Sequence, residues 1–275
     1  MILQKYNVFT ERIIEAGAII TVSEFKDMFK NELYDFYLTN IQLYRGVQSD
    51  AEIIYYAPGS NKRKSIDIKN FYTLLTSNLP AWSEYPRRSN AIIMTTSKNY
   101  ANEYTEKDGN IYRVIPSDNA LMAISPTFDI YTAYTKYFKR WEVTDFPEFI
   151  EGISEAYEEM TGKKLNDTTW ASFSKQVKIF DNIKKLISDV IEASLSLAPF
   201  FLEFVEQIKY KTWLEWMNFM FDPTKTGFKL YHYNKGFNVQ VKGVKGLEIW
   251  TEDECWLVRD DIFKNLQNKG LFPNK

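Results

Sequence analysis

The first 130 residues alternate between short apolar runs and polar breaks. Thr21 and Glu24 have the spacing of a capping box, and the apolar residues after them recur at helical intervals, which predicts a helix over residues 22–37. A further helix is expected before it, over residues 9–17. The same patterns predict, in order, a strand over 41–47, a strand over 53–56, a helix from Phe71 that ends before Pro80, a strand over 91–94, a helix capped by Ser97, and strands over 110–115 and 120–124.

The pattern changes at about residue 131. From there to about residue 221 strand signals are almost absent, and apolar residues such as Phe149, Ile153 and Tyr157 form helical stripes. This stretch predicts roughly three to five helices. The remainder predicts a polar loop over 225–246 with one strand in it, a hairpin of two strands over 247–251 and 254–258 around Glu252-Asp253, and a short helix over 261–267.

Composition places the chain among soluble globular proteins. Its length of 275 residues suffices for one elaborated domain or two small ones, and its 45% hydrophobic and 25% charged residues are ordinary for that class. The net charge of −2 provides no overall field for nucleic acid, so any contact with a polyanion must be local. Cys255 and His232 are the single cysteine and histidine, so we expect neither a disulfide framework nor a metal site. We find no secretion signal and no apolar run long enough for a bilayer, and therefore expect a cytoplasmic protein without membrane contact.

Three short motifs lie where predicted strands end or begin. Arg45 ends the first, and its planar guanidinium can grip phosphate oxygens through two parallel hydrogen bonds, while Gly46 lets backbone approach a ligand closely. The hydroxyls of Thr95-Thr96-Ser97 end the second strand, and Glu248 opens the third. Each has a purely structural alternative. A strand-end arginine can pair with a surface carboxylate, and Ser97 can simply cap the next helix.

The order of these motifs resembles the Arg–Ser–Glu class of mono-ADP-ribosyltransferases, which includes toxin-like bacterial and phage members. The resemblance covers roughly residues 41–130 and 222–262, with Thr95 in the place of the first serine of the family's Ser-Thr-Ser signature. It implies an α+β fold, in which a split β-core of two small sheets carries a large helical insertion. The two sheets are then expected to meet at a cleft where Arg45, Thr95 and Glu248 converge.

The resemblance also divides the chain into four segments. Residues 1–40 are expected to hold N-terminal helices, and 41–130 the first part of the ADP-ribosyltransferase core. Residues 131–221 form the helical insertion, and 222–275 hold an acceptor loop and the second part of the core with the catalytic glutamate. The insertion matches no feature of the family, and is either a stabilising addition or a module that binds an acceptor or partner.

The implied reaction splits the nicotinamide glycosidic bond of NAD⁺ and transfers ADP-ribose to an intracellular macromolecule. NAD⁺ already carries a cationic leaving group, so no proton need be delivered, and one carboxylate can stabilise the oxocarbenium-like transition state. No metal is required. By resemblance, Glu248 contacts the ribose, Thr95 helps to place nicotinamide, Arg45 holds the pyrophosphate, and Gly46, Thr96 and Ser97 complete the NAD⁺ site.

Other residues compete for some of these roles. Glu254 opens the second strand of the predicted hairpin and is the alternative to Glu248, whereas Glu252 in the turn needs no functional role. Upstream, Arg87-Arg88 either touches phosphate or is solvated. Many members of the family carry Glu or Gln, which recognises the acceptor, where this chain has Gly246. Modification of arginine is therefore not supported.

The acceptor stays open between protein and nucleic acid. Lys235, Lys242 and Lys245 offer a local basic groove for RNA or DNA. A toxin, a defence factor and a phage-encoded modifier are all compatible with the sequence, with an antitoxin or inhibitor as a possible partner. Two other functions compete: an NAD⁺ glycohydrolase, in which water is the acceptor, and a non-catalytic binding protein with a degenerate fold of this type.

Overall fold

The computed structural model describes residues 17–29, 42–60, 71–105, 109–139, 213–233 and 246–269, together with isolated positions near 151–163 and at 237 and 241. The helix expected over residues 9–17 lies almost entirely outside these ranges. So do most of the helical block over 131–221 and the three lysines of the predicted basic groove.

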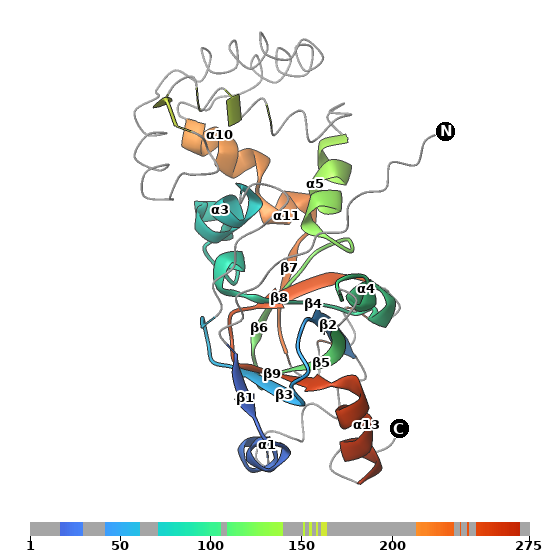
Figure 1. Ribbon diagram of the computed structural model, residues 1–275. Coiled ribbons are helices and arrows are strands. Elements are labelled where there is room, and N and C mark those ends of the chain that lie inside the picture. The colour runs from blue at the N-terminus through green and yellow to red at the C-terminus, as the bar shows by residue number, and fades with distance from the viewer. Residues whose placement is uncertain are drawn as a thin grey trace, which may run out of the picture.

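The described part of the chain is built on nine strands that form one antiparallel sheet, in the order β1-β3-β9-β5-β2-β4-β8-β6-β7 (Figure 1). Most of these strands are short runs of β-branched and aromatic residues, as the sequence patterns predict. Their bounds are β1 Ala18–Ile20, β2 Leu43–Val47, β3 Ile53–Tyr56, β4 Ile92–Thr95, β5 Asn110–Pro116, β6 Leu121–Ile124, β7 Lys229–His232, β8 Glu248–Thr251 and β9 Cys255–Arg259.

Of all neighbouring strands in the sheet, β2 and β4 share the fewest paired residues. β2 pairs with β5 at five positions, but its register with β4 consists of the single pair Tyr44↔Thr95. This pair, which we call the joint, divides the sheet into a first half of β1, β3, β9, β5 and β2 and a second half of β4, β8, β6 and β7. The expectation of two separate small sheets is therefore corrected, because the joint connects both halves into one hydrogen-bonded sheet.

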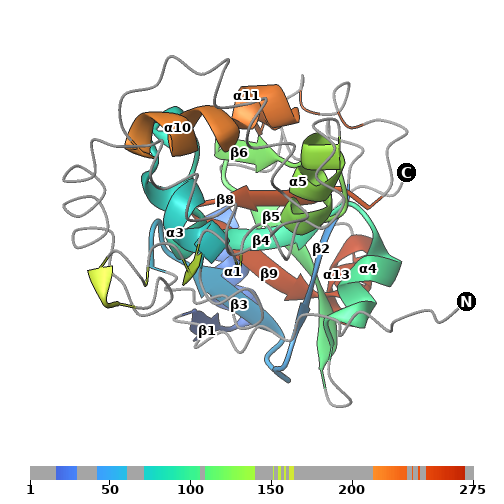
Figure 2. The ribbon, with the colours of Figure 1, turned by 90° about the horizontal axis from the view of Figure 1, so that it is seen from above.

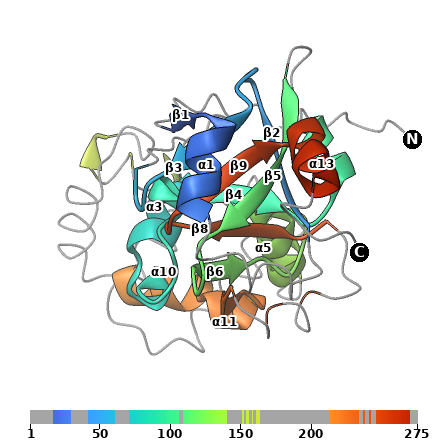
Figure 3. The same ribbon diagram turned by 90° about the horizontal axis from the view of Figure 1, so that it is seen from below.

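The two halves share one hydrophobic core. Inward residues of the first half, such as Leu43 and Leu257, belong to the same buried cluster as Met94, Ile249 and Met122 of the second half. Helices cover the outer sides at opposite ends of the molecule (Figures 1, 2 and 3). They are α1 (Val22–Phe29) and α13 (Asp260–Asn268) at one end, and α3 (Phe71–Asn78), α5 (Ile130–Lys139), α10 (Trp213–Met220) and α11 (Pro223–Thr226) at the other.

The predicted hairpin near the C-terminus is wrong. β8 lies between β4 and β6, whereas β9 lies between β3 and β5, so the two strands belong to different halves of the sheet. Both strands are buried almost throughout, which suits central strands with a neighbour on each side. The turn at Glu252-Asp253 therefore crosses from one half to the other. Its backbone is held by Gly59, whose N–H donates to the Glu252 carbonyl over 2.7 Å.

Near the N-terminus the sequence pattern is confirmed in part. The capping box of α1 forms, since the Thr21 N–H donates to Glu24 Oε2 over 2.7 Å and the Glu24 N–H donates to Thr21 Oγ1 over 3.2 Å. Residues 30–37 of that predicted helix lie outside the described residues. β1 was not predicted, because three residues are too few for a periodic signal, and it pairs with β3 at the sheet edge. No helix among the described residues is long and apolar enough to cross a membrane.

Candidate active site

Glu248 is fixed at the first position of β8 by bonds on both sides. Its backbone N–H donates to the Thr127 carbonyl over 3.1 Å, and its carbonyl accepts from the Ser125 N–H over 2.9 Å. On the other side it stands directly opposite Thr95 of β4. Residues that are directly opposite in an antiparallel pair project from the same face of the sheet. Thr95 and Glu248 therefore share one face, as the expected site requires.

The three hydroxyls that follow β4 organise the loop around this pair. Thr95 Oγ1 accepts from the Ser97 N–H over 3.2 Å, and Ser97 Oγ accepts from the Tyr100 N–H over 3.4 Å, so Ser97 caps α4 (Lys98–Glu103) as predicted. Thr96 Oγ1 accepts from the N–H groups of Gly246 and Leu247 over 2.9 and 3.1 Å. Thr96 thus fixes the segment that leads into Glu248, and the Thr95 hydroxyl can still donate a hydrogen bond.

Arg45 is buried beside the joint. Side chains alternate along a strand, so its Cβ lies on the opposite face of the sheet from Tyr44, and therefore from Thr95 and Glu248. The register of β2 with β4 ends at the Tyr44↔Thr95 pair, and beyond it Arg45 Nη1 donates to the carbonyl oxygen of Ile93. The guanidinium therefore reaches β4 two residues before Thr95. Arg45 and Glu248 lie on strands separated by β4 alone.

Gly46 has a packing role that the sequence interpretation missed. A Cβ built at this position would lie 2.3 Å from the carbonyl oxygen of Ala101 in α4. Real side-chain carbons do not approach backbone oxygen so closely, so glycine is needed for α4 to pack against β2. This close approach lets the helix that follows the three hydroxyls lie over the joint.

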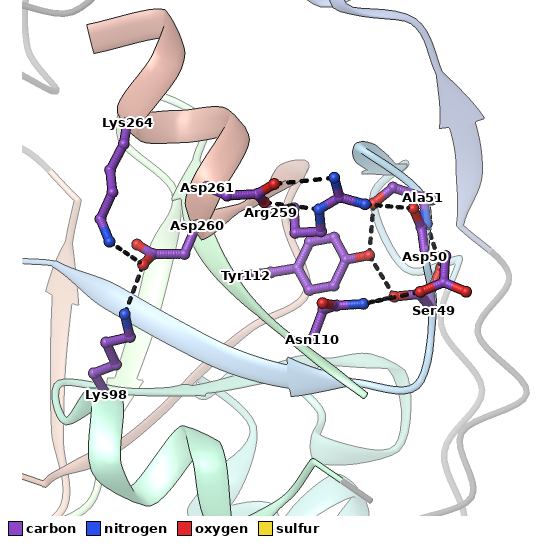
Figure 4. A network of polar contacts seen from close by, with 10 residues as sticks. All are labelled: Ser49, Asp50, Ala51, Lys98, Asn110, Tyr112, Arg259, Asp260, Asp261 and Lys264. Atoms are coloured by element: carbon purple, nitrogen blue, oxygen red, sulfur yellow. Dashed lines mark hydrogen bonds and ion pairs between the residues drawn. The ribbon is translucent and has the colours of Figure 1, made fainter. Parts of the chain in front are cut away.

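A polar network ties the start of α4 to α13 (Figure 4). Lys98 Nζ donates to Asp260 Oδ2 over 2.6 Å, and Lys264 and Arg113 reach the same carboxylate over 3.1 and 2.7 Å. Burial by itself would raise the pKa of Asp260, but hydrogen bonds from Lys98, Arg113 and Lys264 outweigh it and hold the pKa well below its usual value. The ionised carboxylate thus anchors α4 from outside the candidate site.

The guanidinium that contacts Glu248 belongs to Arg88, in the 3₁₀ helix η2 (Arg88–Asn90). Arg88 Nη1 donates to Glu248 Oε1, and the two residues are only 8% and 6% exposed. Trp250 supports this pair twice. Its ring lies 5.6 Å from the Arg88 guanidinium carbon, and its Nε1 donates over 2.9 Å to the carbonyl of Pro86, just before η2. Sequence reasoning did not assign Arg88, because nothing local signals an ion pair across 160 positions.

A second carboxylate, Asp129, and the phenol of Tyr104 lie close enough to Glu248 to feel its charge. Burial, followed by the charge of Glu248, raises the pKa of Asp129 against hydrogen bonds from Thr132. Tyr104 is 38% exposed as a residue, but its hydroxyl is shielded, and this burial together with Glu248 and Asp129 raises its pKa. Asp129 also begins α5, since its carboxylate accepts from the Thr132 N–H over 2.6 Å.

The rival carboxylates lie elsewhere. Glu254 precedes β9, in the first half of the sheet, and its Oε1 accepts from the Tyr55 hydroxyl over 2.5 Å. Glu252 lies in the crossing turn, where its Oε1 accepts from Arg87 Nε over 3.0 Å and the Arg87 side chain is 62% exposed. Arg87 is therefore a surface residue, unlike its neighbour Arg88. Of the three glutamates near the C-terminus, Glu248 is the one paired to Thr95.

The segment before Glu248 packs on an aromatic pair. Gly246 has a φ of +80°, and a Cβ there would lie 2.4 Å from the Tyr100 ring. Tyr100 in turn stacks on Phe128, with parallel planes 3° apart and centroids separated by 5.4 Å. Position 246, where many members of the family that the sequence resembles carry Glu or Gln, thus has no room for such a side chain.

The structure therefore brings Thr95 and Glu248 together and adds Arg88 and Asp129, while Arg45 stands at the joint nearby. Across the described ranges, no three His, Cys, Asp or Glu side chains gather closely enough to hold a metal ion. No protein-family model matches the chain, and no match was found among curated proteins or solved structures. Its function must therefore be argued from this geometry.

Proposed function

We propose that this chain is a mono-ADP-ribosyltransferase that cleaves the nicotinamide glycosidic bond of NAD⁺ and transfers ADP-ribose to an intracellular macromolecule. One observation carries the proposal: Thr95 and Glu248 stand opposite each other on β4 and β8, next to the joint where Arg45 of β2 bonds to β4. Guanidinium, hydroxyl and carboxylate thus come from three consecutive strands of the sheet, β2, β4 and β8, in the same order as the motifs follow each other in the chain.

The reaction needs little from the protein beyond charge and orientation. The bond between the anomeric carbon and the nicotinamide nitrogen breaks, and its electron pair leaves with neutral nicotinamide. The acceptor's nucleophile then bonds to the anomeric carbon and loses its proton. In this mechanism Glu248 faces the ribose, Thr95 donates a hydrogen bond beside it, and Arg45 holds the pyrophosphate.

The charges around Glu248 suit this chemistry. The buried carboxylate of Glu248 and the partly buried carboxylate of Asp129 stand against the single guanidinium of Arg88 that bonds Glu248, so this cluster carries one net negative charge when all three are ionised. Such a site stabilises the positive charge that develops on the ribose as nicotinamide leaves. The same cluster disfavours an anion at this point, which is why the pyrophosphate is assigned to Arg45.

Incubation of the purified protein with NAD⁺ labelled in its adenine, together with cell lysate, tests the proposal. The expected result is label on macromolecules, and its loss on protease or nuclease digestion identifies the acceptor class. Free ADP-ribose without labelled macromolecules would instead indicate a glycohydrolase. Unchanged NAD⁺ in the presence of every lysate fraction would contradict catalysis and favour a binding protein.

A further inference from the structure

We propose that Arg88 is a positioning residue, which holds the Glu248 carboxylate in place and offsets its repulsion with the second carboxylate at Asp129. For its catalytic readout this inference rests on the proposed function, in which Glu248 acts on the ribose. Its electrostatic part concerns the folded protein alone and can be tested without NAD⁺.

The first support is geometric. Arg88 and Glu248 are both nearly inaccessible to water, and the bond between Arg88 Nη1 and Glu248 Oε1 joins η2 to the first residue of β8. The indole of Trp250 supports both partners of this bond. Trp250 lies two positions after Glu248 on β8, and its ring contacts Arg88 and bonds the segment that leads into η2. Arg88 thus approaches Glu248 from a fixed direction, and Glu248 Oε1 is committed to it.

The second support is the set of charged and titratable groups around this carboxylate. Arg88 comes from η2, Asp129 from the start of α5, and Tyr104 from the end of α4. The negative charge of Glu248 raises the pKa of both Asp129 and Tyr104, and the positive charge of Arg88 lowers both. Arg88 is therefore the group in this set that opposes the mutual repulsion of the two acids.

The consequence of removing that charge follows from electrostatics. Two carboxylates that share a buried site cannot both ionise readily, so one binds a proton at higher pH. A neutral residue at position 88 leaves Glu248 and Asp129 in this situation. The enzyme should then lose activity on the acid side of its pH profile, where the wild type stays active. The Glu248 side chain should also be less well oriented, because it loses its hydrogen bond to Arg88.

The variants Arg88→Gln, Arg88→Lys and Arg88→Gln with Asp129→Asn test this directly. In Arg88→Gln we expect kcat to fall about tenfold or more, KM for NAD⁺ to change little, and the acid limb of the pH profile to move up by about 1–3 pH units. Arg88→Lys should recover most of the acid limb, because it keeps the charge. In the double variant the acid limb of the pH profile should move back towards its wild-type position, because asparagine at position 129 removes the second negative charge yet still caps α5.

Denaturation by urea from pH 5 to pH 8 provides a readout that is independent of activity. A carboxyl group with a raised folded-state pKa binds more protons folded than unfolded, so stability falls as the pH rises from about 4 towards that pKa. The loss in free energy of unfolding of Arg88→Gln relative to wild type should therefore grow as the pH rises over this range. Adding Asp129→Asn to Arg88→Gln should make that loss grow less. If Arg88→Gln does not fold, Arg88→Met, which also removes the charge but keeps a long unbranched side chain, replaces it in the same comparison.

The two possible failures are distinguishable. A wild-type protein that leaves NAD⁺ intact refutes the proposed function, while the urea series still decides the electrostatic claim. An active wild type whose pH profile is unchanged by Arg88→Gln, with a stability deficit that is constant with pH, overturns the inference and leaves the function standing.

Discussion

Among single residues, Gly246 shows how closely the segment before Glu248 is fitted. Its backbone has φ of +80°, its N–H donates to Thr96 Oγ1 over 2.9 Å, and its Cα lies against the Tyr100 ring. Any side chain here must both adopt a left-handed conformation and displace an aromatic ring. The residue two positions before Glu248 therefore positions the backbone, and in the proposed reaction the contacts to the acceptor come from other residues.

Gly246→Ala is expected to lower the free energy of unfolding by more than the roughly 1–2 kcal/mol that a left-handed backbone costs, because the clash with Tyr100 adds to it. Gly59→Ala is the matched control. Gly59 has φ of +63° with nothing within 4 Å of a built Cβ, so it should show the backbone cost alone. Urea denaturation of both variants measures the difference, and equal losses would contradict the packing of Gly246 on Tyr100.

Residue types near the site were predictable from sequence only where the signal is local. Ser97 was expected to cap α4 and does so, because a cap is set by residues three positions apart. Arg88 could not be assigned, because its partner is 160 positions away and η2 has no periodic pattern. Glu254 was the alternative to Glu248 in sequence, since both were expected to open a strand, and the sheet order places the two glutamates in different halves.

At the scale of elements, the position of α4 fixes where the hydroxyl groups of Thr95, Thr96 and Ser97 lie. The helix is held at its start by Lys98 on Asp260, and along its length by close contact with Gly46 on β2. Asp260 is the first residue of α13, and the same carboxylate also bonds Arg113 of β5. One buried carboxylate therefore links α4 to α13 directly, as Figure 4 shows for Lys98 and Asp260.

Asp260→Asn is expected to lower the free energy of unfolding by about 3–5 kcal/mol, because it removes one partner from a buried charge cluster. The low folded-state pKa of Asp260 sets the pH dependence. Its contribution is complete above the unfolded pKa of about 4 and is lost as the pH falls below that value. Thermal unfolding at pH 7 and at pH 3 therefore should show a gap between wild type and variant that narrows in acid.

Asp261→Asn is the control for that experiment. Its side chain is 60% exposed and pairs with Arg259 over 2.7 Å at the surface, so the loss should be at most about 1 kcal/mol. A comparable loss in both variants would contradict the anchoring role of Asp260.

At the scale of the whole molecule, the two halves of the sheet form one structural unit. They meet in one hydrogen-bonded pair at the joint, but they share a continuous buried core between their inner faces. The shared core therefore holds β2 and β4 in a fixed relation on either side of the joint. The residues of the candidate site can keep their positions without independent movement of two domains.

Hydrogen exchange measures this cooperativity. The amides of β8 and β9 lie in different halves, and we expect both strands to exchange only through global unfolding, with equal free energies of opening. Mass spectrometry of peptides that cover 247–251 and 255–259 gives these values. A difference of more than about 2 kcal/mol between the strands would show that the halves unfold separately, against the shared core.

The sequence predicted where most described strands lie, but not which strands pair. β3, β5 and β6 fall where alternating or apolar runs indicate them, because that signal is local. β8 and β9 were expected to form a hairpin since they are neighbours in sequence, whereas burial on both faces makes them central strands with other partners. The resemblance led us to expect Thr95 and Glu248 near each other at a cleft, but their direct pairing on adjacent strands of one sheet was not expected, and no local pattern could have supplied it.

The most direct test of the central claim is the rate of nicotinamide release from NAD⁺ by the wild type, Glu248→Gln and Glu254→Gln, measured by chromatography at saturating NAD⁺. Glu248→Gln should lose about 10²–10³-fold or more in kcat while NAD⁺ still binds, because the carboxylate acts on the transition state. Glu254→Gln should retain activity, because its carboxylate is bonded to Tyr55 in the other half. Full activity in Glu248→Gln, or its loss in Glu254→Gln alone, would contradict the account.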